Sequence, residues 1–134
     1  MPRFFTQLLA LALAAGMTGE ALSMPVEGTV TELAKRQIRT GRLSWQDFET
    51  GNAGACGRFI RNSEFAVAIS PALFSQSQCG KIIQITANGR TAQGVVLDSC
   101  PTCTDPNNID LTPGFFQAFA NLQAGVIQGS WQFV

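Results

Sequence analysis

The chain has 134 residues, and its nine basic side chains balance nine acidic ones. A chain of this length has room for one domain of ordinary size. The charged residues form no basic cluster, which excludes the electrostatic signature of nucleic-acid binding. A neutral partner, such as a polysaccharide or the surface of another protein, fits this composition better.

The first residues have the pattern of a targeting segment. Arg3 supplies a positive charge, residues 4–17 are almost wholly apolar, and small residues at 21–23 offer a cleavage site. This pattern is typical of a secretory signal peptide, and the apolar run is shorter than the roughly 20 residues of a membrane-spanning helix. We therefore predict a signal peptide over residues 1–23, secretion to the extracellular space, and no membrane association once the signal is removed.

A polar segment, residues 24–36, separates the signal from the rest of the chain and ends in a Lys-Arg pair. A dibasic pair in this position resembles the processing site of fungal propeptides. We predict cleavage after Arg36 and a mature domain over residues 37–134. The alternative is a solvated basic pair in a flexible leader.

The mature domain opens with a strand and a glycine-rich loop. Over residues 40–48, apolar Leu43 and Trp45 alternate with polar residues, as in a half-buried strand. Residues 49–57 contain three glycines, which predicts a loop around the first cysteine.

The second predicted strand covers residues 64–69 and places Phe65, Val67 and Ile69 on one face. A serine that can cap and a proline suited to a first turn follow it, so residues 70–74 are predicted to form one helical turn. The sequence then breaks into a polar stretch before the next strand.

The Asn88-Gly89 pair predicts a β-hairpin, because both residues tolerate the positive φ angles that a two-residue turn requires. Its strands are predicted over residues 79–86 and 91–97. This hairpin is the clearest local signal in the chain.

The last predicted strand begins at Val126, and its alternation puts Ile127, Trp131 and Phe133 on one face, with Trp131 in the core. Short strands with only small helices, in so small a domain, favour a closed barrel over a layered α/β fold. The predicted fold class is mainly β.

Two carboxylates stand where predicted elements meet. Asp98 follows an apolar run, and Asp110 precedes a short helix predicted over residues 112–122, with Thr112 as its cap and Phe115 among its apolar face. Each carboxylate has a structural interpretation, since Asp98 can bond the amides of the next turn and Asp110 those of the helix start. The functional interpretation is that both serve one binding or catalytic site.

Four cysteines, at 56, 79, 100 and 103, favour disulfides in an exported domain of this size. A zinc site at Cys100-Pro-Thr-Cys103 is the rival, but the chain has no histidine and no second CxxC motif. We predict no metal and no cofactor. By spacing alone the cysteines allow three pairings.

Six short motifs follow one another across the domain, and each of them alone is weak. They are Gly41-Arg-Leu-Ser-Trp45, Gly54-Ala-Cys-Gly57, Cys79-Gly-Lys81, Asp98-Ser-Cys-Pro-Thr-Cys103, Asp110-Leu-Thr-Pro113 and Gly125-Val-Ile-Gln-Gly-Ser-Trp131. Together they resemble the small fungal proteins of the expansin/barwin type, in a superfamily that includes family-45 endoglucanases and the rare lipoprotein A domain. The resemblance implies a six-stranded double-psi β-barrel with short helices.

The resemblance also implies a site and a disulfide pattern. In the expansin-like branch a strand hydroxyl and two aspartates line an open polysaccharide groove, and these positions fall on Ser44, Asp98 and Asp110, with Trp45 as the candidate for stacking on sugars. Relatives of this type link the cysteine of Gly-Ala-Cys-Gly to that of Cys-Gly, which implies Cys56 with Cys79 and Cys100 with Cys103.

Three functions remain open at this point. The first is a secreted, monomeric protein that binds cell-wall polysaccharide without cleaving it, which the absence of a long wall of aromatic residues favours. The second is a glycan-cleaving enzyme of the endoglucanase or lytic transglycosylase type that uses Asp98 and Asp110, whose inverting form needs carboxylates roughly 6.5 to 9.5 Å apart. The third is a protein-binding effector or a protease inhibitor.

Overall fold

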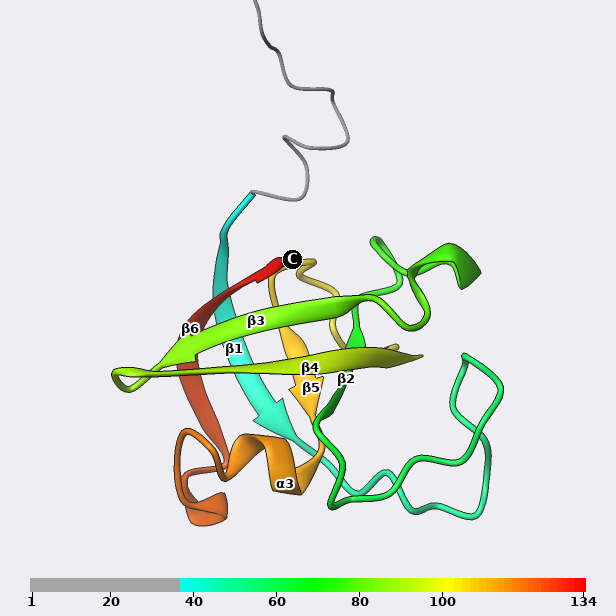
Figure 1. The fold of residues 1–134 in the computed structure, drawn as a ribbon, viewed down its shortest axis with the longest axis horizontal. Coiled ribbons are helices and arrows are strands. Elements are labelled where there is room, and N and C mark those ends of the chain that lie inside the picture. Colours follow the sequence, from blue (N-terminus) through cyan, green and yellow to red (C-terminus); the bar gives the residue numbers. More distant parts are fainter. Residues whose placement is uncertain (1–36) are drawn as a thin grey trace, which may run out of the picture. The chain divides into compact units, whose positions relative to one another are not determined.

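A computed structural model describes residues 37–134 (Figure 1). The predicted signal peptide, residues 1–23, and the predicted propeptide, residues 24–36, lie outside the described residues. Six strands form a closed barrel in the order β1-β5-β2-β4-β3-β6, and β6 pairs with β1 to close it. The strands are β1 (Arg39–Trp45), β2 (Ala66–Ile69), β3 (Ile82–Ala87), β4 (Arg90–Ser99), β5 (Ile109–Leu111) and β6 (Val126–Phe133).

Two connections cross each other on one side of this barrel. β1 pairs with β5, and β2 with β4, in parallel. Because β5 lies between β1 and β2, the connection from β1 to β2 has to pass β5, and the connection from β4 to β5 has to pass β2 in the same way. This double crossing, with six strands and short helices, confirms the predicted double-psi β-barrel.

The interior of the barrel is filled by apolar side chains that alternate along the strands. Leu43, Val67 and Ile85 are fully buried, and Trp131 is 1% exposed, which confirms its predicted place in the core. The indole N–H of Trp131 donates a hydrogen bond to the carbonyl of Asn107, at 2.8 Å. The one polar atom of this large ring is therefore satisfied inside the fold.

Helix α3 (Pro113–Phe116) closes one end of the barrel with two fully buried phenylalanines (Figure 1). The ring of Phe115 reaches β4 at Gly94, where a Cβ atom would lie 2.4 Å from the ring. Because Gly94 has no side chain, it leaves the space that the Phe115 ring fills.

A second apolar cluster, here called the outer cluster, lies apart from the barrel interior. It includes the alanines of β2, which point away from the interior, together with side chains from both crossing connections. Its buried members are Phe48, Ile60, Ala66, Ala68, Leu97, Cys100 and Cys103. β2 is therefore buried on both faces, which is usual for strands in parallel pairs.

The second predicted strand, expected over residues 64–69, is shorter in the structure. β2 begins only at Ala66, and Phe65 lies before it, 42% exposed, with its ring stacked on Phe115 at a centroid distance of 4.9 Å. Residues 70–74 form the single helical turn that was predicted, because the amides of Leu73 and Phe74 donate to the carbonyl of Ser70 three and four residues earlier. The turn is not continued into a helix.

The predicted helix over residues 112–122 is also wrong in length. α3 spans four residues, and a separate 3-10 turn, η2 (Leu122–Ala124), follows it. Thr112 precedes α3 but does not cap it with its side chain, because its hydroxyl donates to the carbonyl of Glu64 instead. Asn121 caps η2, accepting a hydrogen bond from the amide of Gln123 at 2.9 Å.

The predicted hairpin turn is confirmed, but the first strand of the hairpin begins three residues later than predicted. Asn88 and Gly89 have φ angles of 52° and 76°, and they join β3 to β4 with Ala87 paired to Arg90. β3 begins at Ile82, because the residues from 79 to 81 belong to a turn after the short 3-10 helix η1 (Gln76–Gln78).

One strand was not predicted from the residue pattern. β5 has three residues, too few to show alternation, and it is stabilised by neighbours distant in sequence on both sides. Within residues 37–134, no helix is long and apolar enough to cross a membrane.

Candidate functional site

Ser44, Asp110, Ala68 and Asp98 lie next to one another on four neighbouring strands. Ser44 pairs with Asp110, Asp110 with Ala68, and Ala68 with Asp98. Paired residues point to the same face of a sheet, and this face is the outer one, because Ala68 belongs to the outer cluster. We call this set the Ser44–Asp98 row; at roughly 4.8 Å per strand it extends about 14 Å.

A β-bulge in β4 brings Asp98 into this row. Val67 pairs with Val96, and Ala68 pairs with Asp98, so that Leu97 is an extra residue on β4. Val96 packs in the barrel interior, and without the bulge Asp98, two residues later, would point there too. The bulge turns its carboxylate to the outer face, as bulges do beside many sites.

The carboxylate of Asp98 also has a structural role. Its Oδ1 accepts hydrogen bonds from the amides of Ala55, at 2.7 Å, and Ser99, at 2.8 Å. The bond from Ser99 is of the kind that the structural interpretation predicted, whereas the bond from Ala55, which holds the glycine-rich loop against the end of β4, was not predicted. Both of these hydrogen bonds use Oδ1, so Oδ2 takes no part in holding the loop.

Asp110 is placed differently from its prediction, since it lies in the middle of β5 and not at a helix start. It is 8% exposed, and its Oδ1 accepts a hydrogen bond from the hydroxyl of Ser44. Its Oδ2 lies 3.3 Å from Sγ of Cys100, which as a disulfide sulfur has no hydrogen to donate. Asp110 is therefore the more buried of the two carboxylates in the row, and Asp98 is the more exposed.

Both disulfides have the pairing that the resemblance implied. Cys56 is bonded to Cys79, and Cys100 to Cys103. The first bond ties the glycine-rich loop to the segment before β3. The sulfurs of the second lie close to a carboxylate oxygen of Asp110, but disulfide formation removes the thiolates that a metal ion would need.

Trp45 is the member of the predicted site that the structure does not bring to the row. It follows Ser44 on β1, points to the opposite face, and packs against the barrel interior. Its indole N–H donates to the carbonyl of Leu122 at 2.9 Å. The ring is therefore part of the fold's packing and is not turned toward the row.

Sequence reasoning missed an exposed aromatic residue near Asp98. Phe59 is 65% exposed and lies in the long connection between β1 and β2. Its neighbour Arg58 forms a two-pronged ion pair with Glu64, with N–O distances of 2.7 and 3.2 Å. The hydrogen bond from Arg58, assisted by the Arg61 amide, lowers the pKa of Glu64 below its ordinary value. No alternation or spacing in this connection marks Phe59 in advance.

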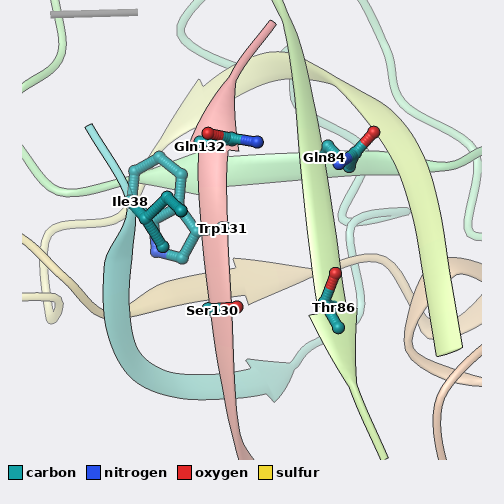
Figure 2. A pocket seen from close by; sticks show the side chains of 6 residues that line it. All are labelled: Ile38, Gln84, Thr86, Ser130, Trp131 and Gln132. Atoms are coloured by element: carbon teal, nitrogen blue, oxygen red, sulfur yellow. The ribbon is translucent and has the colours of Figure 1, made fainter. Parts of the chain in front are cut away.

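A shallow pocket lies elsewhere, on the outer face between β3 and β6 (Figure 2). Its volume of about 70 Å³ corresponds to roughly two water molecules, whereas small-molecule sites have about 300 to 1,000 Å³. The pocket is therefore too small for a substrate. It is lined by Ile38, Gln84, Thr86, Ser130, Trp131 and Gln132.

No family model matches this chain. Among curated proteins, the papain inhibitor of Streptomyces mobaraensis is 32% identical over 134 aligned residues, which cover 93% of this chain and 90% of the inhibitor. Allergen Asp f 7 of Aspergillus fumigatus is 31% identical over 122 residues, covering 88% of this chain. The chain spans only 44% of the length of that allergen.

The comparison with solved structures also finds a papain inhibitor, together with an expansin. The Streptomyces papain inhibitor has a TM-score of 0.68 at 32% identity, covering 74% of this chain and 96% of the inhibitor. The expansin of Clavibacter michiganensis has a TM-score of 0.66 at 26% identity, covering 73% of this chain and 50% of the expansin. A mutant of that expansin, solved in complex with cellohexaose, has a TM-score of 0.65 at 25% identity. With its closed barrel, its crossing connections and these relatives, the chain belongs to the expansin-like and barwin-like double-psi β-barrel proteins.

Proposed function

We propose that this chain is a secreted protein that binds cell-wall polysaccharide along the Ser44–Asp98 row without cleaving it. The observation that carries the proposal is the register that aligns one hydroxyl and two carboxylates across four strands. Carboxylate oxygens accept hydrogen bonds from sugar hydroxyls, and a serine hydroxyl both donates and accepts. The expansin solved with cellohexaose supports a glycan as the partner.

The geometry of the two carboxylates favours binding over cleavage. Inverting hydrolysis needs a proton-donating carboxylic acid, a second carboxylate and a water molecule between them and the sugar. Asp98 uses Oδ1 to hold two backbone amides, and Asp110 is 8% exposed. Ala68, which separates them, is fully buried. Binding requires less, namely Oδ2 of Asp98 and the exposed edge of the row.

A pull-down on insoluble cellulose, chitin and β-1,3-glucan tests this function. Asp98→Asn keeps an oxygen that can accept from both amides, so it should fold normally and bind at least about tenfold less polymer. Asp105→Asn is the control, since it removes the same charge from an exposed loop outside the row. Equal binding by the two variants would contradict the assignment of the row. Release of reducing sugar by the wild type would contradict the non-cleaving part.

A second candidate is inhibition of a cysteine protease. The similarity to a papain inhibitor favours it, because this similarity covers 90% of the inhibitor, whereas only half of the expansin is covered. Titration of papain with the mature protein, residues 37–134, tests it directly. We expect stoichiometric loss of papain activity if this function holds, and unchanged activity at a large excess of the protein would exclude papain as the target.

A further inference from the structure

Phe59 has the most exposed large apolar side chain in the described part of the chain. Single exposed apolar residues are common and by themselves need no explanation. Two further observations set Phe59 apart, namely its position beside the Ser44–Asp98 row and the contacts that hold its backbone.

Gly54 connects Phe59 to the row. Its amide donates to the carbonyl of Arg58 at 2.9 Å, and the next amide, that of Ala55, donates to Oδ1 of Asp98. A Cβ atom on Gly54 would lie 2.8 Å from Cδ1 of Ile60 and 3.3 Å from the carboxyl carbon of Asp98. Residues 58–60 therefore run alongside the Asp98 end of the row.

The direction of the Phe59 side chain follows from its neighbour. Ile60 is 3% exposed and belongs to the outer cluster, whereas Phe59 is 65% exposed. The two side chains thus point to opposite sides of this segment. Ile60 anchors it to the protein, and Phe59 faces solvent.

The backbone at Phe59 is held in place by the ion pair next to it. Nη1 of Arg58 donates to the carbonyl of Phe59 at 2.9 Å and also to Glu64. Glu64 in turn accepts from the amide of Arg61 at 2.8 Å. A ligand that contacts Phe59 has little loop entropy to remove, which favours binding.

A sugar ring has a rim of hydroxyls and two faces of C–H bonds, so a site for it needs hydrogen-bonding groups beside an aromatic surface. The row supplies the hydrogen-bonding groups, but Trp45 is packed against the interior. We propose that Phe59 is the aromatic surface of this site and stacks on a sugar of a neutral polysaccharide at the Asp98 end of the row. This inference rests on the proposed polysaccharide binding and names the residue that would give it much of its affinity.

The surroundings of Phe59 favour a glycan as its binding partner over a protein that would receive the side chain in a pocket. Central anchors of protein interfaces are surrounded by further contacts that exclude water. Phe59 instead has a glycine-rich loop, a charged pair and the polar row beside it. At the other end of the row, Val126 pairs with Ser44 and is 46% exposed, which offers a second apolar contact.

The test compares three substitutions in the mature protein, using whichever of cellulose, chitin and β-1,3-glucan the wild type binds. Phe59→Ala should bind about tenfold more weakly, Phe59→Leu nearly as weakly, and Phe59→Trp as well as the wild type, because only Trp keeps an aromatic face. Ile82→Ala is the control, since it shortens an exposed apolar side chain on β3. Melting temperatures should be unchanged, and Phe59→Leu, which keeps most of the volume, decides the matter if Phe59→Ala fails to fold.

The outcomes separate this inference from the function on which it rests. Equal binding by Phe59→Ala and wild type would overturn the role of Phe59 and leave polysaccharide binding standing. Failure of the wild type to bind any of the three polymers would overturn both. Loss of papain inhibition by Phe59→Ala, with polymer binding intact, would overturn the inference in favour of a protein pocket.

Discussion

The two sides of this barrel are built in different ways. On one side, β3 pairs with β4 and β6 in antiparallel fashion, and its outer face carries uncharged polar residues such as Gln84 and Thr86, each level with a similar residue on both neighbours. On the other side, β1, β5, β2 and β4 include parallel pairs joined by long crossing connections. The six acidic side chains of residues 37–134 all lie on this second side or in its connections, in residues 47–64 and 98–110.

This difference between the two sides determines where the barrel presents charged groups on its outer face. The β3–β4 hairpin on the antiparallel side joins residues close in sequence, and the polar groups on the outer face of β3 are amides and hydroxyls. The parallel side depends on contacts between distant segments, and its carboxylates both hold the connections together and face outward. At Asp98 a structural role and the proposed binding role therefore fall on the same carboxylate, so a substitution there should change both stability and binding.

The largest expected effect is the loss of the Cys56–Cys79 disulfide from the parallel side. The bond closes a loop with a sequence separation of 23 residues, for which chain entropy predicts about 3.4 kcal/mol of stability. The Cys100–Cys103 bond, with a separation of 3, should contribute only about 1.9 kcal/mol by the same relation. Urea unfolding of the two double Cys→Ser variants measures both values, and an equal loss would contradict the entropic explanation.

The next largest effect separates the two roles of Asp98. Asp98→Ala leaves the amides of Ala55 and Ser99 without their acceptor, which should cost about 1 to 3 kcal/mol of unfolding free energy. Asp98→Asn keeps an acceptor oxygen and should cost less than about 1 kcal/mol. If both variants lose the same stability, the charge itself holds the loop. In that case polymer binding has to be compared per folded molecule.

On the antiparallel side, the corresponding test is the hairpin turn. Asn88 has a φ of 52° and donates a hydrogen bond from its side chain to the carbonyl of Phe119 at 2.9 Å. Asn88→Ala should cost about 1 to 2 kcal/mol because alanine is strained at this angle and the hydrogen bond is lost. Asn88→Gly relieves the strain, so its cost in thermal unfolding should be smaller and should combine the lost hydrogen bond with the greater flexibility of the unfolded chain. Polymer binding should be unchanged in both variants.

The same contrast explains how much could be predicted from sequence. The Asn88-Gly89 turn and the alternation that buries Trp131 are local signals, and both are confirmed. The alternation of β1 also placed Trp45 on the face opposite Ser44, although this was not used to exclude Trp45 from the site. Local patterns are sufficient where a two-residue turn or a strand long enough to show alternation carries the signal.

The parallel side could be predicted only through family resemblance. The three-residue β5 shows no period, so Asp110 was assigned to a helix start and not to a strand. The bulge that turns Asp98 outward depends on pairing with β2, which no pattern within β4 reveals. The resemblance supplied the two disulfides and the grouping of Ser44 with the carboxylates. It did not supply Phe59, which lies in a connection without periodicity.

The smallest expected effect concerns the ion pair that holds the backbone of Phe59. Since the hydrogen bond from Arg58 lowers the pKa of Glu64 below 4.5 in the folded state, the pair should stabilise the protein above about pH 4.5 and lose this contribution as the pH falls through the lowered value. Glu64→Gln should therefore be less stable than wild type at pH 7, by at most about 1 kcal/mol because the pair is partly exposed.

The pKa of Asp47 is also lowered, chiefly by the side chain of Asn62. Asp47 is present in both proteins, so the difference in stability between them isolates Glu64. Melting temperatures measured from pH 7 to pH 2.5 should converge in acid, and a difference that stays constant across this range would show that Glu64 acts through packing and not through its charge.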